Sequence, residues 1–277
     1  MQEAILVKPT PETKPKGQHQ PVKRRWPSPA AKKHLAYAVF VLAWTGFSIV
    51  FSQYAIIYPM SWILGAKLNQ PFWTLVFYLL YNGLALTLIL VVPPQIFKYY
   101  QRRGRKLNSD SDQLLHTNPD ELGVANWPTF VDLGLAPIAY FVYAVVAGII
   151  VNLLSLLPWF NANEAQNVGF GPVLTGSDRI IAVIALVFVA PIFEEIIMRG
   201  WLYGKLRNKF KIPLAIFLTS ALFGLLHGQV NVGVTVFVLS VVLCGLREIT
   251  GTIWCGILLH MLTNGIAFYF LYVGFGL

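Results

Sequence analysis

The stretch Phe193-Glu194-Glu195-Ile196-Ile197-Met198-Arg199 places two adjacent acids and an arginine in an otherwise apolar segment. The run from Ile180 to Phe193 carries no charge, so a helix spanning a bilayer here would reach its carboxylates in or near the hydrocarbon. An ionisable group at the bilayer centre costs roughly 2.5–3.5 kcal/mol, and such groups usually face a polar cavity with a function. The alternative is a solvated helix end in the headgroup layer, built from the same two acids and Arg199.

The amino-acid composition is typical of a membrane protein. Of the 277 residues 56% are hydrophobic and 12% are charged, whereas soluble domains have about a quarter of their residues charged. The formal net charge is +9, and many of the basic residues flank the first two apolar runs. These basic residues are Lys8, Lys14, Lys16, Lys23, Arg24, Arg25, Lys32, Lys33, Lys98, Arg102, Arg103, Arg105 and Lys106. Such clusters are typical of cytoplasmic loops beside anionic lipid, so we expect a lipid bilayer as partner and no nucleic acid.

The chain divides into three parts. Residues 1–33 are rich in Pro, Lys and Gln and predict a disordered basic cytoplasmic tail. Residues 34–120 predict two transmembrane helices and a basic cytoplasmic loop, and residues 121–277 predict a transmembrane domain that carries the intramembrane polar groups. Spans are expected at 35–58, 72–97, 130–157, 179–205, 213–227, 232–246 and 252–273.

These expectations define an all-α fold, a polytopic transmembrane helical bundle of about seven to eight spans with a cytoplasmic N terminus. The eighth would be an interfacial or re-entrant helix. Asn118 or Asp120 is expected to cap a short helix, Ser177 or Asp178 to cap the helix that leads to the acids, and Pro213 to lie in the first turn of the fifth span. A turn is expected at residues 247–248.

Polar groups recur at similar depths in three of the expected spans. Measured along each helix from its basic end, Glu194, His227 and His260 lie roughly 13–24 Å deep, at about 1.5 Å per residue. The spacing is also consistent, since four residues separate the members of each of three pairs and each pair therefore shares a helix face. These pairs are Glu195 with Arg199, Phe223 with His227, and His260 with Asn264.

The two acids are expected to have different roles, because neighbouring positions point about 100° apart on a helix. One would serve chemistry and the other would pair with Arg199. The residues of the other two pairs also have purely structural interpretations. His227 fits a loop histidine bonded to backbone, His260 with Asn264 fits a polar clasp between helices, and Phe223 fits ordinary packing.

Two chemistries use such a set of residues. In one, a carboxylate aided by a histidine deprotonates water, and an amide or imidazole stabilises the oxyanion of a peptide bond under attack. In the other, a zinc ion held by Glu194, His227 and His260 activates the water. The spacing does not choose between them, although the HExxH pattern of common zinc proteases is absent.

The three motifs Glu194-Glu195-x-x-x-Arg199, Phe223-x-x-x-His227 and His260-x-x-x-Asn264, in this order, resemble the CPBP family of membrane proteases. That family includes the CAAX prenyl endopeptidases and the bacteriocin-processing Abi proteins. The resemblance runs from about Glu121 to Phe270, so residues 121–277 are expected to be the catalytic transmembrane domain.

The resemblance implies that Glu194 and His227 activate water, that His260 and Asn264 bind the oxyanion, and that Glu195, Arg199 and Phe223 give structural support. It also implies no metal cofactor. We therefore expect an intramembrane endopeptidase that acts on a membrane-associated protein or peptide, in a bacterial plasma membrane. The alternatives are a non-catalytic scaffold or bacteriocin-immunity protein that retains the motifs, and a transporter with buried charges along an ion path.

Overall fold

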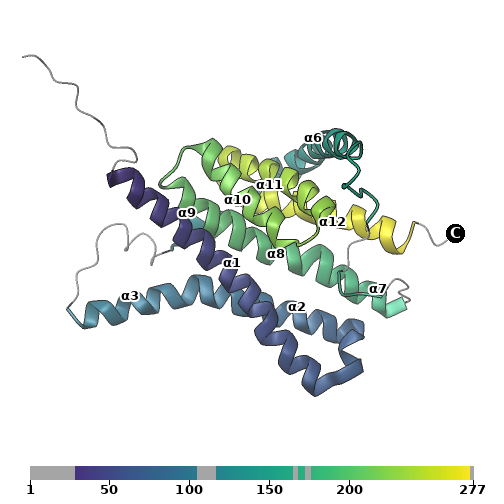
Figure 1. Cartoon of the computed structure of the whole chain (residues 1–277), viewed down its shortest axis with the longest axis horizontal. Coiled ribbons are helices and arrows are strands. Elements are labelled where there is room, and N and C mark those ends of the chain that lie inside the picture. The colour runs from purple at the N-terminus through teal and green to yellow at the C-terminus, as the bar shows by residue number, and fades with distance from the viewer. Residues whose placement is uncertain (1–28, 105–116, 165–167, 172–175, 275–277) are drawn as a thin grey trace, which may run out of the picture.

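The computed structural model describes residues 29–104, 117–164, 168–171 and 176–274, which form a bundle of helices (Figure 1). No strand occurs within these ranges, and the predicted all-α fold class is confirmed. The main helices are α1 (Pro29–Leu64), α2 (Pro71–Leu86), α3 (Val92–Arg102), α5 (Pro119–Leu122), α6 (Phe130–Leu154), α7 (Gly176–Val183), α8 (Ala190–Glu195), α9 (Gly204–Arg207), α10 (Ile212–Leu226), α11 (Val230–Thr250) and α12 (Trp254–Tyr272). Short 3-10 or π segments connect several of them: η1 (Gly65–Asn69), η2 (Thr87–Val91), η3 (Ile184–Val189) and η4 (Ile196–Tyr203).

Six helical segments among the described residues are long and apolar enough to cross a membrane. They are Lys32–Asn69, Pro71–Arg102, Phe130–Leu154, Gly176–Arg207, Val230–Thr250 and Trp254–Tyr272. The helix expected at 213–227 is present as α10, but its 15 residues extend only about 22 Å, less than the roughly 30 Å of hydrocarbon. Large apolar side chains on α6 stand exposed, as Phe130 (92%) and Phe141 (69%) do, which suits contact with lipid. The chain is a multi-pass membrane protein.

Helix α1 takes in part of the predicted tail. The described residues are helical from Pro29 on, so Lys32 and Lys33, assigned to the disordered tail, lie in α1. Alanine and lysine are good helix formers, which is consistent with helix at this point. Residues 1–28 of the predicted tail and residues 105–116 of the predicted basic loop lie outside the described residues.

The span that carries the two acids is continuous but not uniform. From Gly176 to Arg207 it passes through α7, the π segment η3, α8, the π segment η4 and α9. Single turns of π-helix are rare and often occur at functional sites. Glu194 and Glu195 end α8, roughly 27 Å from the start of this span and 20 Å from its end at 1.5 Å per residue. The acids therefore lie in the interior of the helix.

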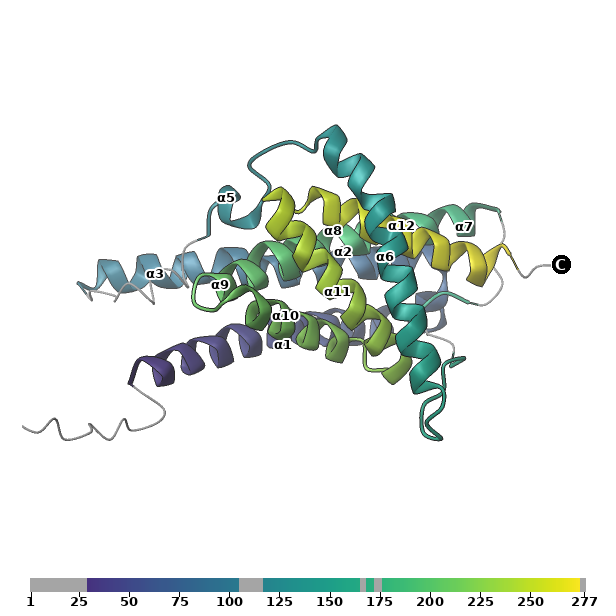
Figure 2. The same ribbon diagram turned by 90° about the horizontal axis from the view of Figure 1, so that it is seen from above.

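Helices α10 and α11 lie side by side in both views (Figures 1 and 2), and two glycines allow their close approach. A Cβ on Gly224 would lie 2.7 Å from the carbonyl oxygen of Gly233, and a Cβ on Gly233 would lie 2.9 Å from that of Gly224. Small residues at helix crossings let backbones approach in this way inside membranes. The contact fixes α10, and with it His227 at its C-terminal end.

The sequence-based helix ends were correct in part. Asn118 caps α5 by accepting a hydrogen bond from the Glu121 amide, and Pro213 lies in the first turn of α10, as predicted. The described part of α7 is helical from Gly176, so the two residues expected to cap it lie inside the helix. The turn predicted at 247–248 was wrong. Helix α11 continues to Thr250 and ends at Gly251, whose φ of +71° suits glycine, whereas arginine and glutamate favour the helix.

The short helix α5 is attached to the end of the bundle that carries α9. Lys205 Nζ lies 3.0 Å from Glu121 Oε2, and the Ile253 amide donates to the Gly123 carbonyl at 3.1 Å. Arg247 donates to the carbonyl oxygens of Glu121 and Gly251. These contacts join α5, α9, α11 and α12.

Candidate active site

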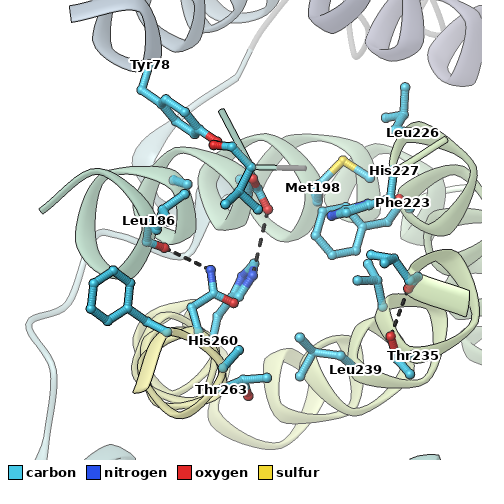
Figure 3. A pocket seen from close by; sticks show the side chains of 18 of the residues that line it. Tyr78, Leu186, Met198, Phe223, Leu226, His227, Thr235, Leu239, His260 and Thr263 are labelled. Carbon is cyan, nitrogen blue, oxygen red and sulfur yellow. Dashed lines mark hydrogen bonds and ion pairs between the residues drawn. The ribbon is translucent and has the colours of Figure 1, made fainter. Parts of the chain in front are cut away.

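A cavity of about 400 Å³ lies between the helices and collects the polar residues singled out in the sequence. Its wall includes Glu194 from α8, Phe223 from α10, His227 just after α10, and His260 and Asn264 from α12. Figure 3 shows His260 on one side of this space and the neighbouring Phe223 and His227 on another. Residues separated by up to 70 positions in the sequence therefore share one cavity, as their estimated depths predicted.

Glu195 and Arg199 lie behind this wall. Arg199 Nη1 is 2.8 Å from Glu195 Oε1, and the two side chains are 1% and 0% exposed. The ion pair expected from their four-residue spacing is present, and its burial excludes the solvated helix end. The His260 ring reaches the same carboxylate, with Nδ1 2.9 Å from Oε1. A carboxylate that pairs with arginine accepts hydrogen bonds, so Nδ1 of His260 carries a proton. The other ring nitrogen, Nε2, is not used in this contact.

Glu194 differs from its neighbour in both direction and exposure. Its side chain is 27% exposed and lines the cavity, and its Oε2 lies 3.7 Å from Nε2 of His260. Among the described residues that line the cavity, it is the only carboxylate. The roughly 100° between adjacent helical positions accounts for the difference, since one acid points to the cavity while Glu195 points to Arg199.

His227 is oriented by its own helix. Its Nδ1 lies 2.8 Å from the carbonyl oxygen of Phe223, one turn earlier, at the point where α10 ends. A carbonyl can only accept, so Nδ1 donates and Nε2 keeps a free lone pair. This bond is the backbone contact that a structural reading expected, and it also fixes the tautomer that a proton acceptor needs.

Phe223 packs against three of the polar residues. Its ring meets His227 and His260 edge to face, with ring centroids 4.9 Å and 6.0 Å apart. The Arg199 guanidinium carbon lies 4.5 Å from the centre of the same ring, a cation–π distance. Phe223 is 3% exposed, so it both packs and orients the two imidazoles.

Asn264 lies one turn after His260 and lines the cavity. Its Nδ2 donates to the carbonyl oxygen of Leu186 at 2.9 Å (Figure 3). Leu186 belongs to the π segment η3, where the regular i to i−4 bonding is interrupted. One amide hydrogen anchors Asn264, and the amide has a second hydrogen that remains available to a ligand.

The described side chains do not fit a metal ion as they stand. No group of three or more His, Cys, Asp or Glu residues within the described ranges could hold one. His260 uses Nδ1 to bond Glu195 and His227 uses Nδ1 to bond backbone. We therefore derive no step through zinc, and the absence of a metal cofactor stays a prediction.

Several polar residues of the cavity wall were missed in the sequence. Four of them come from the first two long helices, Gln53 from α1 and Tyr78, Tyr81 and Asn82 from α2. A signal was available, because Tyr78, Tyr81 and Asn82 recur at helical spacing in an apolar run. No motif marks these two helices, and their proximity to Glu194 depends on packing between distant parts of the chain.

Comparison with known proteins agrees with the motifs. Residues 176–266 match the family described as type II CAAX prenyl endopeptidase Rce1-like. The matched region runs from α7 to α12 and contains all seven residues that the motifs supplied. The predicted resemblance is confirmed. No match was found among curated proteins or among solved structures.

Proposed function

We propose that this chain, whose residues 176–266 match the Rce1-like family of type II CAAX prenyl endopeptidases, hydrolyses a peptide bond of a membrane-associated protein or peptide. The observation that supports the proposal is the composition of the cavity wall. It combines one carboxylate, Glu194, with two imidazoles and an amide, while the second acid, Glu195, is buried against Arg199. One acid can then change its protonation state without disturbing the ion pair behind it.

Glu194 is the general base. With His227 it removes a proton from a water molecule in the cavity, and the oxygen of that water attacks the carbonyl carbon of the substrate. The free lone pair on Nε2 of His227 suits it to accept a hydrogen bond from the same water. When the tetrahedral intermediate collapses, the C–N bond breaks and Glu194 returns its proton to the leaving amine.

His260 and Asn264 bind the oxyanion. Glu195 holds Nδ1 of His260 at 2.9 Å, which directs Nε2 toward the cavity and Glu194. When His260 carries both protons, its Nε2–H and the second amide hydrogen of Asn264 are donors for the negative oxygen. Preorganised donors of this kind are worth roughly 10²–10³ in kcat each.

The substrate reaches this cavity from the membrane. Much of the wall is apolar, including Leu239 and Phe268, and six segments of the chain are suited to a bilayer. A lipid-modified or membrane-spanning peptide fits such surroundings, and nothing in the charge pattern calls for nucleic acid. The basic clusters favour a cytoplasmic N terminus by the positive-inside rule, and the location that we propose is a bacterial plasma membrane.

The test compares peptides from cells that carry wild type, Glu194→Gln or His227→Ala at matched protein levels. New C termini that occur only with wild type are the expected result. Glu164→Gln is the matched control, since Glu164 is exposed and lies outside the cavity wall. It should cleave like wild type.

The rival is a scaffold or immunity protein that keeps the polar network for stability alone. The buried Glu195–Arg199–His260 contacts would serve such a protein equally well. Identical peptide profiles for wild type and both variants, with any cellular phenotype retained, would leave this rival and end the catalytic proposal.

A further inference from the structure

Helices α1 and α2 lie outside the region matched to the family, yet they close one side of the cavity. Helix α2 packs along α7, η3 and α8, the part of the chain that leads to Glu194. Tyr78 of α2 stacks on Phe170 and donates to the carbonyl oxygen of Val168 at 3.2 Å. This side of the cavity is therefore ordered against the catalytic helices, and Figure 3 shows Tyr78 at its edge.

Two of the four polar residues on this side donate hydrogen bonds within the protein. Asn82 donates to the Tyr78 carbonyl oxygen at 2.8 Å and is 2% exposed, and Tyr78 bonds Val168. Gln53 of α1 differs. Its side chain lines the cavity and is half-buried, but it makes no hydrogen bond to any described residue.

An unpaired amide on a membrane-spanning helix is costly unless it meets water or a ligand. Gln53 lines the cavity, so a ligand bound there can supply the hydrogen-bond partner that its amide lacks among the described residues. An amide offers both a donor and an acceptor, which is the pair of groups that the backbone of an extended peptide presents. Leucine or alanine in its place would line the cavity at lower cost.

We infer that Gln53 is a positioning residue that hydrogen-bonds the peptide backbone of the substrate beside the bond to be cut. The inference rests on the proposed function. It assigns substrate alignment to α1, whereas the chemistry belongs to α8, α10 and α12. Gln53 does not touch the reacting atoms, so its loss weakens substrate binding more than turnover.

The test uses the full-length chain in nanodiscs and an internally quenched peptide that copies a bond cut only by wild type in the cellular experiment. For Gln53→Leu we expect KM to rise about 5- to 10-fold with kcat within about twofold of wild type. Gln53→Asn should recover part of the loss, because it restores an amide. Gln95→Leu carries the same substitution at an exposed position of α3 outside the cavity, and should match wild type.

A binding measurement separates alignment from folding. In the Glu194→Gln background, the same peptide is compared with an analogue methylated at the backbone nitrogen next to the cleaved bond. If Gln53 bonds the backbone there, methylation weakens binding when Gln53 is present and has little further effect when leucine replaces it. An equal effect of methylation in both proteins, or an unchanged KM in Gln53→Leu, overturns the inference and leaves the proposed function standing. Absence of any wild-type-dependent cleavage overturns both.

Discussion

Nδ1 of His260 lies 2.9 Å from Oε1 of Glu195, a carboxylate that is 0% exposed and also binds Arg199. Two adjacent glutamates thus meet one imidazole from different sides, since Glu194 approaches Nε2 at 3.7 Å. The buried acid holds the ring, and the acid in the cavity is free for chemistry.

This arrangement predicts that glutamine destabilises the protein strongly at position 195 and only slightly at position 194. Glu195→Gln removes the charge that balances Arg199, and breaking a buried ion pair on one side costs about 3–5 kcal/mol. Glu194→Gln should change the free energy of unfolding by only about 0.5 kcal/mol, because its side chain faces the cavity. Thermal unfolding of both purified variants in detergent measures the difference. Equal destabilisation would contradict the division of roles.

Gly256 of α12 predicts a second effect on the same carboxylate. A Cβ at this position would lie 3.1 Å from Oε2 of Glu195, so Gly256→Ala must displace the carboxylate or the helix by a few tenths of an ångström. Because small misplacements of catalytic groups can cost up to roughly 10²-fold in rate, we expect cleavage to fall at least about tenfold while the protein still folds. Gly245→Ala on α11 is the control, since nothing lies within 4 Å of its added Cβ. The measurement is the rate of peptide cleavage by Gly256→Ala, Gly245→Ala and wild type at equal protein levels.

The sequence predicted the helices better than their contacts. Apolar runs and the positions of Pro213 and Asn118 were sufficient to find α10 and the start of α5, because these signals are local. The direction of Glu194 and Glu195 also followed from local geometry, since adjacent helical positions diverge by about 100°. The π segments η3 and η4 could not be predicted, because they leave the apolar pattern unchanged.

Gln53 and Tyr78 were missed for a different reason. Both lie in apolar helices without a motif, and scattered polar residues are common in the helices of membrane bundles. Their place in the cavity wall depends on the packing of α1 and α2 against segments about 100 or more positions later in the chain, as α2 packs on η3 and α8. A pattern within one helix contains no information on which face a distant helix will meet.

The attachment of α5 yields a prediction on stability. Lys205 has a side chain only 2% exposed and pairs at 3.0 Å with Glu121, which is 37% exposed, whereas Arg207 and Glu248 form a pair that is 39% and 28% exposed. A hydrogen bond to a charged group contributes roughly 1.5–3 kcal/mol, and an exposed ion pair contributes about 0–1 kcal/mol. Glu121→Gln should therefore lower the thermal midpoint clearly more than Glu248→Gln does. The reverse order would show that α5 is not held through Lys205.

The contact between α10 and α11 predicts a loss of both packing and activity. An alanine at Gly224 would bring its Cβ within 2.7 Å of the Gly233 carbonyl oxygen, so the helices must separate. Because His227 follows α10 directly, Gly224→Ala should lower the thermal midpoint and reduce cleavage together. Gly134→Ala on α6 controls for the change of residue type, since nothing lies within 4 Å there. Unchanged unfolding and cleavage in Gly224→Ala would mean that the helices tolerate separation.

The last prediction concerns metal ions. Glu194, His227 and His260 would have to converge on a zinc ion, but no three such side chains within the described ranges are grouped to hold one. His260 is held by Glu195 and His227 by the Phe223 carbonyl, so convergence would require breaking or redirecting these contacts. We expect peptide cleavage by the purified chain to be unaffected by 1,10-phenanthroline or EDTA and unchanged by added zinc. Loss of activity with chelator, restored by zinc and accompanied by about one bound zinc per chain in elemental analysis, would replace the glutamate-and-histidine mechanism with a metal-assisted one.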